Sequence, residues 1–284
     1  MSAPARLARR VLKPAAAWIL SRAARAYVAG DDAEDAERLV ARLARRGLGA
    51  TVGFWNEERD APRAVADQYL ECLRRCRPGD YVSIKLPALG WSRTLFDELA
   101  AAAAPPGTRL HFDAMQPDTA ERTCVFVDAL PEAVRARCGV TLPGRWARSV
   151  GDAAWATERR LAVRVVKGQW PDPLQPDIEP RAGFERVVGS LAGRAAQVAV
   201  ATHDAPLVRA ALGLLAAAGT RCELELLHGL PRRQALAAAA PFAVPARIYV
   251  GYGYSFVPYA VGGLLDDPRR LLWLLRDAAG LGAR

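Results

Sequence analysis

Two hydrophobic patterns alternate along most of the chain. Short apolar runs bounded by glycine, proline or polar residues predict buried strands, and longer stretches with apolar residues at helical spacing predict amphipathic helices. The strands are expected at 50–55, 81–86, 109–113, 139–142, 161–167, 197–202, 221–226 and 247–250. The helices that follow them are expected at 61–76, 94–104, 119–130, 150–160, 183–194, 206–218, 232–239 and 257–278. One more helix, 33–46, is expected before the first strand.

These strand–helix units predict the fold class. Several strands are continuously apolar, which is typical of parallel strands with both faces buried. Eight units in a chain of 284 residues favour a closed (β/α)₈ barrel, of the TIM type, over an open doubly wound sheet. No GxGxxG follows the first strand and no GxxxxGK[ST] occurs, which argues against a Rossmann fold and a P-loop. We expect N-terminal helices within 1–48 to pack on a barrel formed by 49–284.

Composition narrows the class of protein. Hydrophobic residues make up 51% of the chain and charged residues 24%, which is typical of a folded globular protein. No apolar run approaches the ~18 residues of a membrane-spanning helix. The five cysteines are irregularly spaced, which argues against a disulfide framework and for a reducing compartment, so we expect a cytoplasmic protein. Because there is no CxxC and no histidine close to a cysteine, no metal site is expected.

The net charge of +9 comes from 36 arginines and only three lysines. Basic and acidic residues are mixed along most segments, whereas a nucleic-acid surface favours a basic stripe with interleaved aromatic residues. Nucleic acid is therefore not expected as a partner. Residues 1–30 differ, because they hold six basic residues and no acidic one. A folded helix is the favoured interpretation of this segment, and a targeting segment or a helix on the inner surface of a membrane stay open.

Candidate chemistry lies where the predicted strands end, since barrel enzymes place their active sites at that face. Lys85 and Lys167 each close an apolar strand. In a chain so rich in arginine, two lysines at equivalent positions indicate a need for a compact point charge, although lysines that extend to the surface are the alternative. Asp113 and His203 also stand at strand ends, where a purely structural role is equally open. Segment 249–259 holds four of the seven tyrosines, which could wall a flat ring or pack as a loop over the barrel.

The chain resembles the flavin-dependent proline dehydrogenases over nearly its whole length. The segments that carry the resemblance are Tyr81–Gly90, His111–Ala114, Val163–Gly168, Ala201–His203, Glu225–Leu230, Arg247–Tyr249 and Pro258-Tyr259. The resemblance implies non-covalently bound FAD. It also implies an enzyme of proline metabolism, or one similar to it, that oxidises a C–N bond of a proline-like or other secondary amine to an imine. A quinone or another acceptor would take the electrons.

The resemblance also implies roles for individual residues. Arg164 would lie against the N5 edge of the flavin. The phosphate and adenosine side of FAD would be held by Lys167, Gly168, Thr202 and His203. The substrate side would be walled by Lys85, Asp113, Tyr249 and Tyr259, which with Arg164 are the candidate catalytic residues.

The chain departs from the family where the substrate would bind. The family carries two adjacent arginines three and four residues after Tyr259, and they hold the substrate carboxylate. Here those positions are Gly262 and Gly263. A glutamine expected near the flavin pyrimidine corresponds to Pro143. Glu57 resembles a glutamate that pairs with one of the absent arginines.

These departures leave two alternatives open. The barrel could be retained as a flavin-binding or regulatory protein without amine oxidation. It could also be a different barrel enzyme that uses Lys85 or Lys167 to form a Schiff base with a carbonyl substrate. The sequence does not identify the amine or the acceptor.

Overall fold

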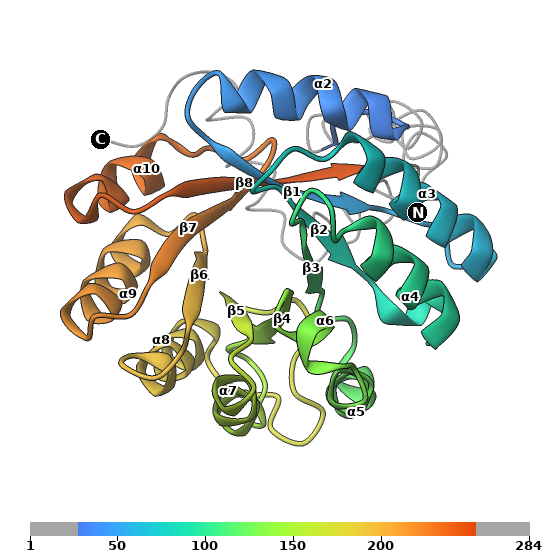
Figure 1. The fold of residues 1–284 in the computed structure, drawn as a ribbon. Coiled ribbons are helices and arrows are strands. Elements are labelled where there is room, and N and C mark those ends of the chain that lie inside the picture. Colours follow the sequence, from blue (N-terminus) through green and yellow to red (C-terminus); the bar gives the residue numbers. More distant parts are fainter. Residues whose placement is uncertain (1–27, 254–284) are drawn as a thin grey trace, which may run out of the picture.

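A computed structural model describes residues 28–253, which form a closed barrel of eight parallel strands (Figure 1). The strands are β1 (Gly49–Phe54), β2 (Tyr81–Ile84), β3 (Arg109–Phe112), β4 (Cys138–Pro143), β5 (Ala162–Val166), β6 (Gln197–Ala201), β7 (Cys222–Leu227) and β8 (Ala246–Tyr252). Each strand pairs with its neighbours in sequence, and β8 closes the barrel by pairing in parallel with β1. The (β/α)₈ class predicted from the sequence is confirmed.

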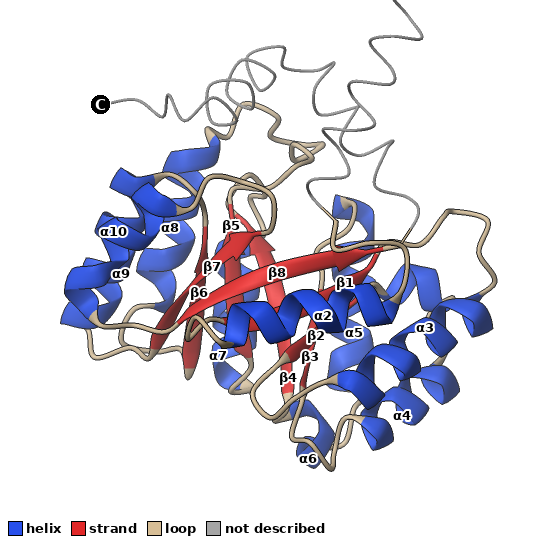
Figure 2. Cartoon of the chain, turned by 90° about the horizontal axis from the view of Figure 1, so that it is seen from above, coloured by secondary structure: helices blue, strands red, loops and turns tan. Residues whose placement is uncertain are grey.

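Helices surround the barrel on its outside (Figure 2). They are α2 (Ala33–Ala44), α3 (Pro62–Arg75), α4 (Arg93–Ala102), α5 (Ala120–Asp128), α6 (Glu132–Arg135), α7 (Ser149–Glu158), α8 (Pro180–Leu191), α9 (Ala205–Ala217) and α10 (Arg233–Ala239). None of the helices between residues 28 and 253 is long and apolar enough to cross a membrane. Helix α2 packs against β1 and β8, where the barrel closes.

The predicted element bounds need small corrections with local causes. Helix α8 begins at Pro180 rather than at 183, because the Glu179 carboxylate caps it by accepting the N–H groups of Arg181 and Ala182. Strand β8 continues past Val250 to Tyr252, because its last residues still pair with β1. The short helix α6 was not predicted. The expected helix 257–278 and residues 1–27 lie outside the described residues.

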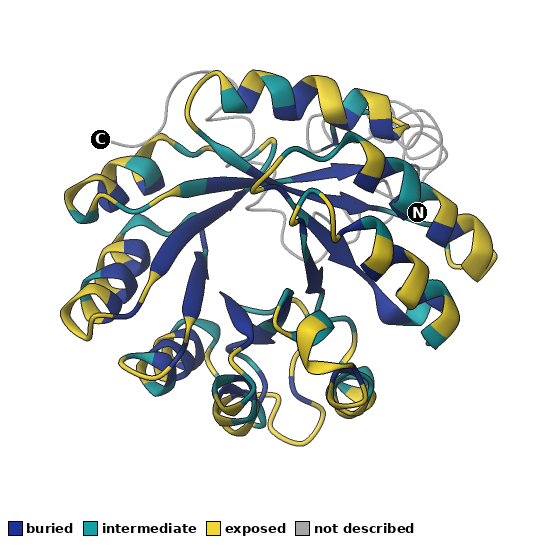
Figure 3. Ribbon diagram, in the orientation of Figure 1, coloured by how far each residue is buried: buried dark blue, intermediate teal, exposed yellow. Residues whose placement is uncertain are grey.

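The apolar core lies between the strands and the helices around them, and the strands are buried along most of their length (Figure 3). In β5 and β6, Val163, Val165, Val198 and Val200 are all fully buried between the sheet and its helices. Complete burial of such a side chain stabilises the fold by about 1.5–3 kcal/mol relative to exposure. The continuous apolar runs that predicted the strands therefore correspond to the sheet–helix interface.

The barrel interior is polar, whereas branched apolar side chains fill most barrels of this class. Side chains that interact across it are Tyr81, Ser83, Arg109, His111, Asp113, Thr141, Arg164, Glu223, Glu225, Arg247 and Tyr249. Glycines on neighbouring strands make room for them. A Cβ at Gly139 would lie 2.4 Å from Nδ1 of His111, and a Cβ at Gly53 would lie 2.2 Å from the hydroxyl oxygen of Tyr249.

This packing predicts opposite effects for two glycine substitutions. Gly139→Ala should lower the free energy of unfolding by about 1–3 kcal/mol, because the added methyl group collides with the His111 ring. Gly151→Ala should raise it by about 0.5–1 kcal/mol, because this exposed position in α7 has no atom within 4 Å of an added Cβ and alanine favours the helix. Urea unfolding measures both, and a stabilised Gly139→Ala protein would contradict this account of the interior.

Candidate functional site

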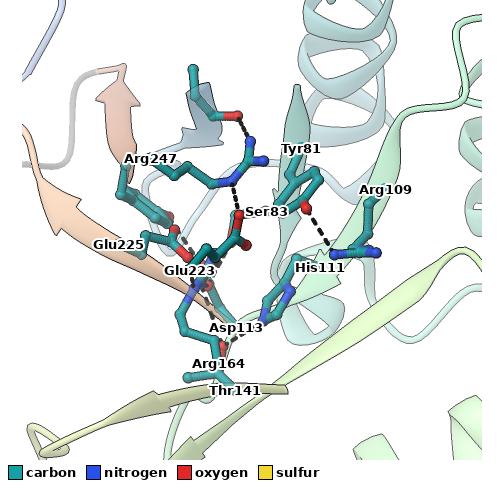
Figure 4. Close-up of polar contacts among 12 residues, drawn as sticks. Tyr81, Ser83, Arg109, His111, Asp113, Thr141, Arg164, Glu223, Glu225 and Arg247 are labelled. Carbon is teal, nitrogen blue, oxygen red and sulfur yellow. Dashed lines mark hydrogen bonds and ion pairs between the residues drawn. The ribbon is translucent and has the colours of Figure 1, made fainter. Parts of the chain in front are cut away.

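Arg164 lies at the centre of a buried group of charges inside the barrel (Figure 4). It extends from β5, and 4% of its side chain is exposed. Its Nη1 donates to Oδ1 of Asp113 at 2.8 Å, and its Nε donates to Oε2 of Glu225 at 2.9 Å. Burial by itself lowers the pKa of Arg164, but Glu225 and Asp113 outweigh it and hold the pKa above its ordinary value. The guanidinium therefore stays charged between two carboxylates.

Asp113 is held by two further donors. The Ser83 hydroxyl donates to Oδ1 at 2.5 Å, and the Tyr249 hydroxyl donates to Oδ2 at 3.0 Å. The Arg164 guanidinium also lies over the Tyr249 ring, with Cζ 5.3 Å from the ring centroid. Burial, followed by the charge of Asp113, raises the pKa of Tyr249 well above its ordinary value. Tyr249 is thus a neutral donor that fixes the carboxylate.

Two buried polar atoms of this group have no hydrogen-bond partner among the described residues. They are Nη2 of Arg164 and Oε1 of Glu225. A buried polar atom left unpaired costs about 1–3 kcal/mol, and such atoms commonly pair with water or a ligand. The group therefore keeps one donor atom and one acceptor atom that no described residue pairs.

Lys85 is also buried, since only 8% of the residue is exposed. It follows β2, its Nζ donates to the backbone oxygen of Phe54 at 3.0 Å, and its backbone N–H donates to the Tyr69 hydroxyl at 3.1 Å. Burial lowers the pKa of Lys85 from 10.5 to about 8, and the negative charge of Asp113 opposes this shift. For Lys85, the alternative of a lysine that extends to the surface is wrong.

Lys167 follows β5 and is more exposed than Lys85, at 39% of its side chain. Its Nζ donates to Oδ2 of Asp204 at 2.9 Å, and Nη1 of Arg181 lies 3.4 Å from the same oxygen. The other oxygen of Asp204 caps α9 by accepting the N–H of Leu207. Burial opposes ionisation of Asp204, but the Lys167 hydrogen bond keeps its pKa below the ordinary value. Two cations share this carboxylate, and Arg181 also lies 3.6 Å from Oε1 of Glu185.

His203 has both ring nitrogens engaged within the protein. Nδ1 lies 2.7 Å from the backbone oxygen of Pro231, and the backbone N–H of Leu227 donates to Nε2 at 2.9 Å. Nδ1 therefore carries the proton, and burial holds the pKa of the ring below its ordinary value. A ligand would meet the carbon atoms of His203 rather than a nitrogen. Thr202 precedes it, and its hydroxyl accepts the N–H of Asp204.

Other residues singled out in the sequence lie around the barrel mouth. Gly168 has a φ of +96°, and a Cβ there would lie 2.9 Å from Cβ of Pro143, so this position favours glycine. Pro143 is the last residue of β4. Glu57 pairs with Arg59 at 2.7 Å. The candidate residue Tyr259 and the two departures Gly262 and Gly263 lie outside the described residues.

Glu225, Ser83 and Thr141 complete the buried group, although no role was predicted for them. The Thr141 hydroxyl accepts from Nη1 of Arg164 at 3.3 Å and lies 3.2 Å from Nε2 of His111. The sequence signal that could have identified these three residues is the presence of polar residues inside otherwise apolar strands. In β7, two glutamates alternate with leucines, which indicates that both carboxylates face the interior.

A second polar layer fills the opposite end of the barrel. Nε of Arg247 pairs with Oε2 of Glu223 at 3.3 Å. The Tyr81 ring lies between two guanidinium groups, with its centroid 3.3 Å from Cζ of Arg247 and 4.5 Å from Cζ of Arg109. Because Tyr81 and Arg109 begin their strands, this layer occupies the end remote from the mouth.

A small cleft lies beside β3 and β4, next to helices α5 and α7. Phe112, Trp146 and Trp155 line it, and it reaches Asp113 and Thr141 of the buried group. It brings aromatic surface close to the carboxylate that holds Arg164.

Comparison with known proteins places this chain beside the proline dehydrogenases. No family model matches it. The proline dehydrogenase of Deinococcus radiodurans is 24% identical over 273 residues, which cover 88% of this chain and 88% of that protein. Proline dehydrogenase 1 of Bacillus subtilis (strain 168) is 23% identical over 275 residues, 89% of each chain.

Solved structures show the same fold. The chain matches proline utilization A (PutA) from Bdellovibrio bacteriovorus, inactivated by N-propargylglycine, with a TM-score of 0.75, at 17% identity and over 87% of this chain. It matches PutA from Corynebacterium freiburgense with a TM-score of 0.65, at 18% identity and over 97%. It spans 33% and 34% of those two chains. The resemblance to proline dehydrogenases found in the sequence is confirmed.

The burial of Lys85 predicts an unusual stability effect. Lys85→Met keeps the unbranched stem and removes the ammonium group. At pH 7 the folded protein buries a charge that the unfolded chain keeps in water, because the folded pKa of about 8 lies below 10.5. We expect the variant to be more stable by about 1–3 kcal/mol, after allowing for the lost hydrogen bond to Phe54.

Urea unfolding across a pH series measures this effect. The gain should be full below pH 8 and shrink as the pH rises towards 10.5, because wild-type Lys85 then loses its proton first in the folded state. A Lys85→Met protein less stable than wild type at pH 7 would contradict the burial cost.

Proposed function

We propose that the chain is an FAD-dependent oxidoreductase of the proline dehydrogenase type, which oxidises a C–N bond of a small secondary amine to an imine. The observation that carries this proposal is the buried guanidinium of Arg164. Its Nη2 has no hydrogen-bond partner among the described residues, inside a (β/α)₈ barrel that resembles proline dehydrogenases in sequence and fold.

The residues present fit an FAD molecule in charge and hydrogen bonding. The diphosphate is anionic, and Lys167 and Arg181 supply two cationic groups that meet at Asp204. The flavin ring presents hydrogen-bond acceptors, and Nη2 of Arg164 is a buried donor in need of one. Further contacts would come from the loops that follow β5 and β6, through Gly168, Thr202 and the carbon atoms of His203. When bound, FAD would supply the hydride acceptor.

The residues of the chain itself would orient the amine and accept the proton that it loses. Oxidation of the C–N bond removes a hydride and a proton. Nζ of Lys85, with a pKa of about 8, is able to hold that proton near neutral pH. Asp113 fixes Arg164 and Tyr249 in place, which keeps their donors aimed without reorganisation during reaction. Tyr259 would add to the substrate wall.

The proposal extends to partners. A quinone or another two-electron acceptor would reoxidise the cofactor. The basic residues 1–30 would bring a cytoplasmic protein to the inner, anionic face of a membrane, where such an acceptor dissolves.

A flavin-binding protein without amine oxidation is the competing function, and Gly262 and Gly263 in place of an arginine pair favour it. The visible spectrum of the purified protein separates the two. A yellow protein that bleaches on anaerobic addition of an amine supports the enzyme. A yellow protein that no amine bleaches supports the competing function, and a colourless one that cannot be reconstituted with FAD contradicts both.

Flavin retention should depend on the two proposed cofactor cations. Arg164→Ala and Lys167→Ala should each weaken flavin binding about 10- to 100-fold, or prevent its reduction, because each removes a charge-assisted hydrogen bond. Arg63→Ala is the control, since Arg63 pairs with exposed acids on the outside of the barrel. Flavin content is read from the absorbance ratio of the purified variants. Full flavin content and normal reduction in both site variants would defeat the residue assignment.

Free proline should be a poor substrate. A carboxylate that enters a closed site without a cation keeps a desolvation cost, and loss of a buried ion-pair partner costs about 3–5 kcal/mol, or a 10²- to 10³-fold or greater loss in binding. Glycines at 262 and 263 offer no side chain to pair with it. Proline, a proline ester and pyrrolidine are compared in steady-state assays with an artificial acceptor.

The expected order is ester or pyrrolidine above proline. The variant with Gly262→Arg and Gly263→Arg should shift the preference towards proline. If wild type already turns over proline as efficiently as its ester, another cation holds the carboxylate, and Lys85 is the candidate.

A further inference from the structure

We propose that Glu225 is a positioning residue that holds the Arg164 guanidinium and, with Asp113, cancels its positive charge, so that the bound flavin is held at a low reduction potential. This inference rests on the proposed function and deepens it. It assigns a role to a residue outside the predicted site.

The geometry fixes the guanidinium from two sides. Glu225 on β7 accepts from Nε, and Asp113 beyond β3 accepts from Nη1, at 2.9 Å and 2.8 Å (Figure 4). Glu225 is 3% exposed and Arg164 is 4% exposed. Since the two carboxylates come from strands on different sides of the barrel, the guanidinium cannot rotate without breaking one ion pair. Only Nη2 then remains for a ligand.

The charge of Glu225, rather than its hydrogen bond, distinguishes this arrangement. A glutamine at 225 would offer Nε an amide oxygen of the same shape and would avoid the cost of burying a carboxylate. Oε1 of Glu225 also lacks a hydrogen-bond partner within residues 28–253, so the carboxylate is less well compensated than Asp113, which accepts from Ser83, Tyr249 and Arg164. The negative charge is therefore the property that needs an explanation.

The charge balance supplies the explanation. Arg164, Asp113 and Glu225 sum to one negative charge, and the Lys85 ammonium, which interacts with Asp113, brings the group to neutrality. With an uncharged residue at 225 the group would be cationic. Hydride uptake adds negative charge to the flavin, and a cationic site stabilises that charge whereas a neutral site does not. At an effective dielectric constant of about 20, one unit charge within about 10 Å changes such an equilibrium on the order of tenfold. Glu225 thus opposes flavin reduction and limits turnover to amines that donate hydride readily.

Glu225→Gln tests this role in the FAD-loaded protein. We expect equilibration with redox dyes to show the flavin couple shifted about tenfold towards reduction, which is about 30 mV for two electrons. Glu223→Gln is the matched control. Glu223 lies two residues earlier on the same strand, is as buried, and pairs with Arg247 in the layer farther from the mouth, so its substitution should shift the potential clearly less than Glu225→Gln.

Each outcome decides the proposal. An unchanged potential in Glu225→Gln overturns it, and equal shifts in both variants overturn it in favour of a general loosening of the barrel. If wild type binds no flavin, the proposed function fails on its own, and the apoprotein still tests the pairing by NMR. There the Arg164 Nε–H signal, identified by its loss in Arg164→Lys, should be protected from exchange in wild type and Glu225→Gln. It should lose protection in Glu225→Ala. An unprotected signal in wild type overturns the positioning role.

Discussion

A guanidinium buried inside a β-barrel cannot be left without counter-charges, and this requirement organises the centre of the molecule. Transfer of such a group from water costs several kcal/mol, which is recovered only when charges and hydrogen bonds surround it. Arg164 obtains them from residues on or just after four other strands, through Ser83, Asp113, Thr141 and Glu225. The positions of these strands and the charge at the centre therefore depend on each other.

The same requirement explains the small residues of the barrel. Long polar side chains fill the interior only if the facing positions carry little or no side chain, as at Gly53 and Gly139. The polar interior also separates two layers with different character. The layer around Tyr81 satisfies its charges within the protein, whereas the layer around Arg164 leaves Nη2 and an oxygen of Glu225 without a partner among the described residues. Among the charged groups of the two layers, the unpaired atoms thus lie in the layer nearer the mouth.

The architecture could be predicted from the sequence because each strand and helix of the barrel has its own local hydrophobic pattern. Apolar runs mark strands, and helical spacing marks the helices between them. Lys85 and Asp113 were singled out for the same reason, since a polar residue at the end of an apolar run is a local signal. The ion pair between Arg164 and Glu225 was not predicted. The two residues are 61 positions apart, and no local pattern around either of them indicates that they are in contact. The engagement of both His203 nitrogens likewise depends on a distant loop at Pro231.

The closed ring of strands has a consequence for how this sequence can change over time. Replacement of Arg164 alone would leave two carboxylates buried without their cation, and replacement of either acid would leave part of the guanidinium unmatched. Because these groups are in contact, the effects of their substitutions do not add. Viable change here has to occur in compensating pairs, whereas an outward valine such as Val200 can be exchanged for another apolar residue by itself. We therefore expect substitutions of the charged residues inside the barrel to occur together, and substitutions in the core between strands and helices to occur one at a time.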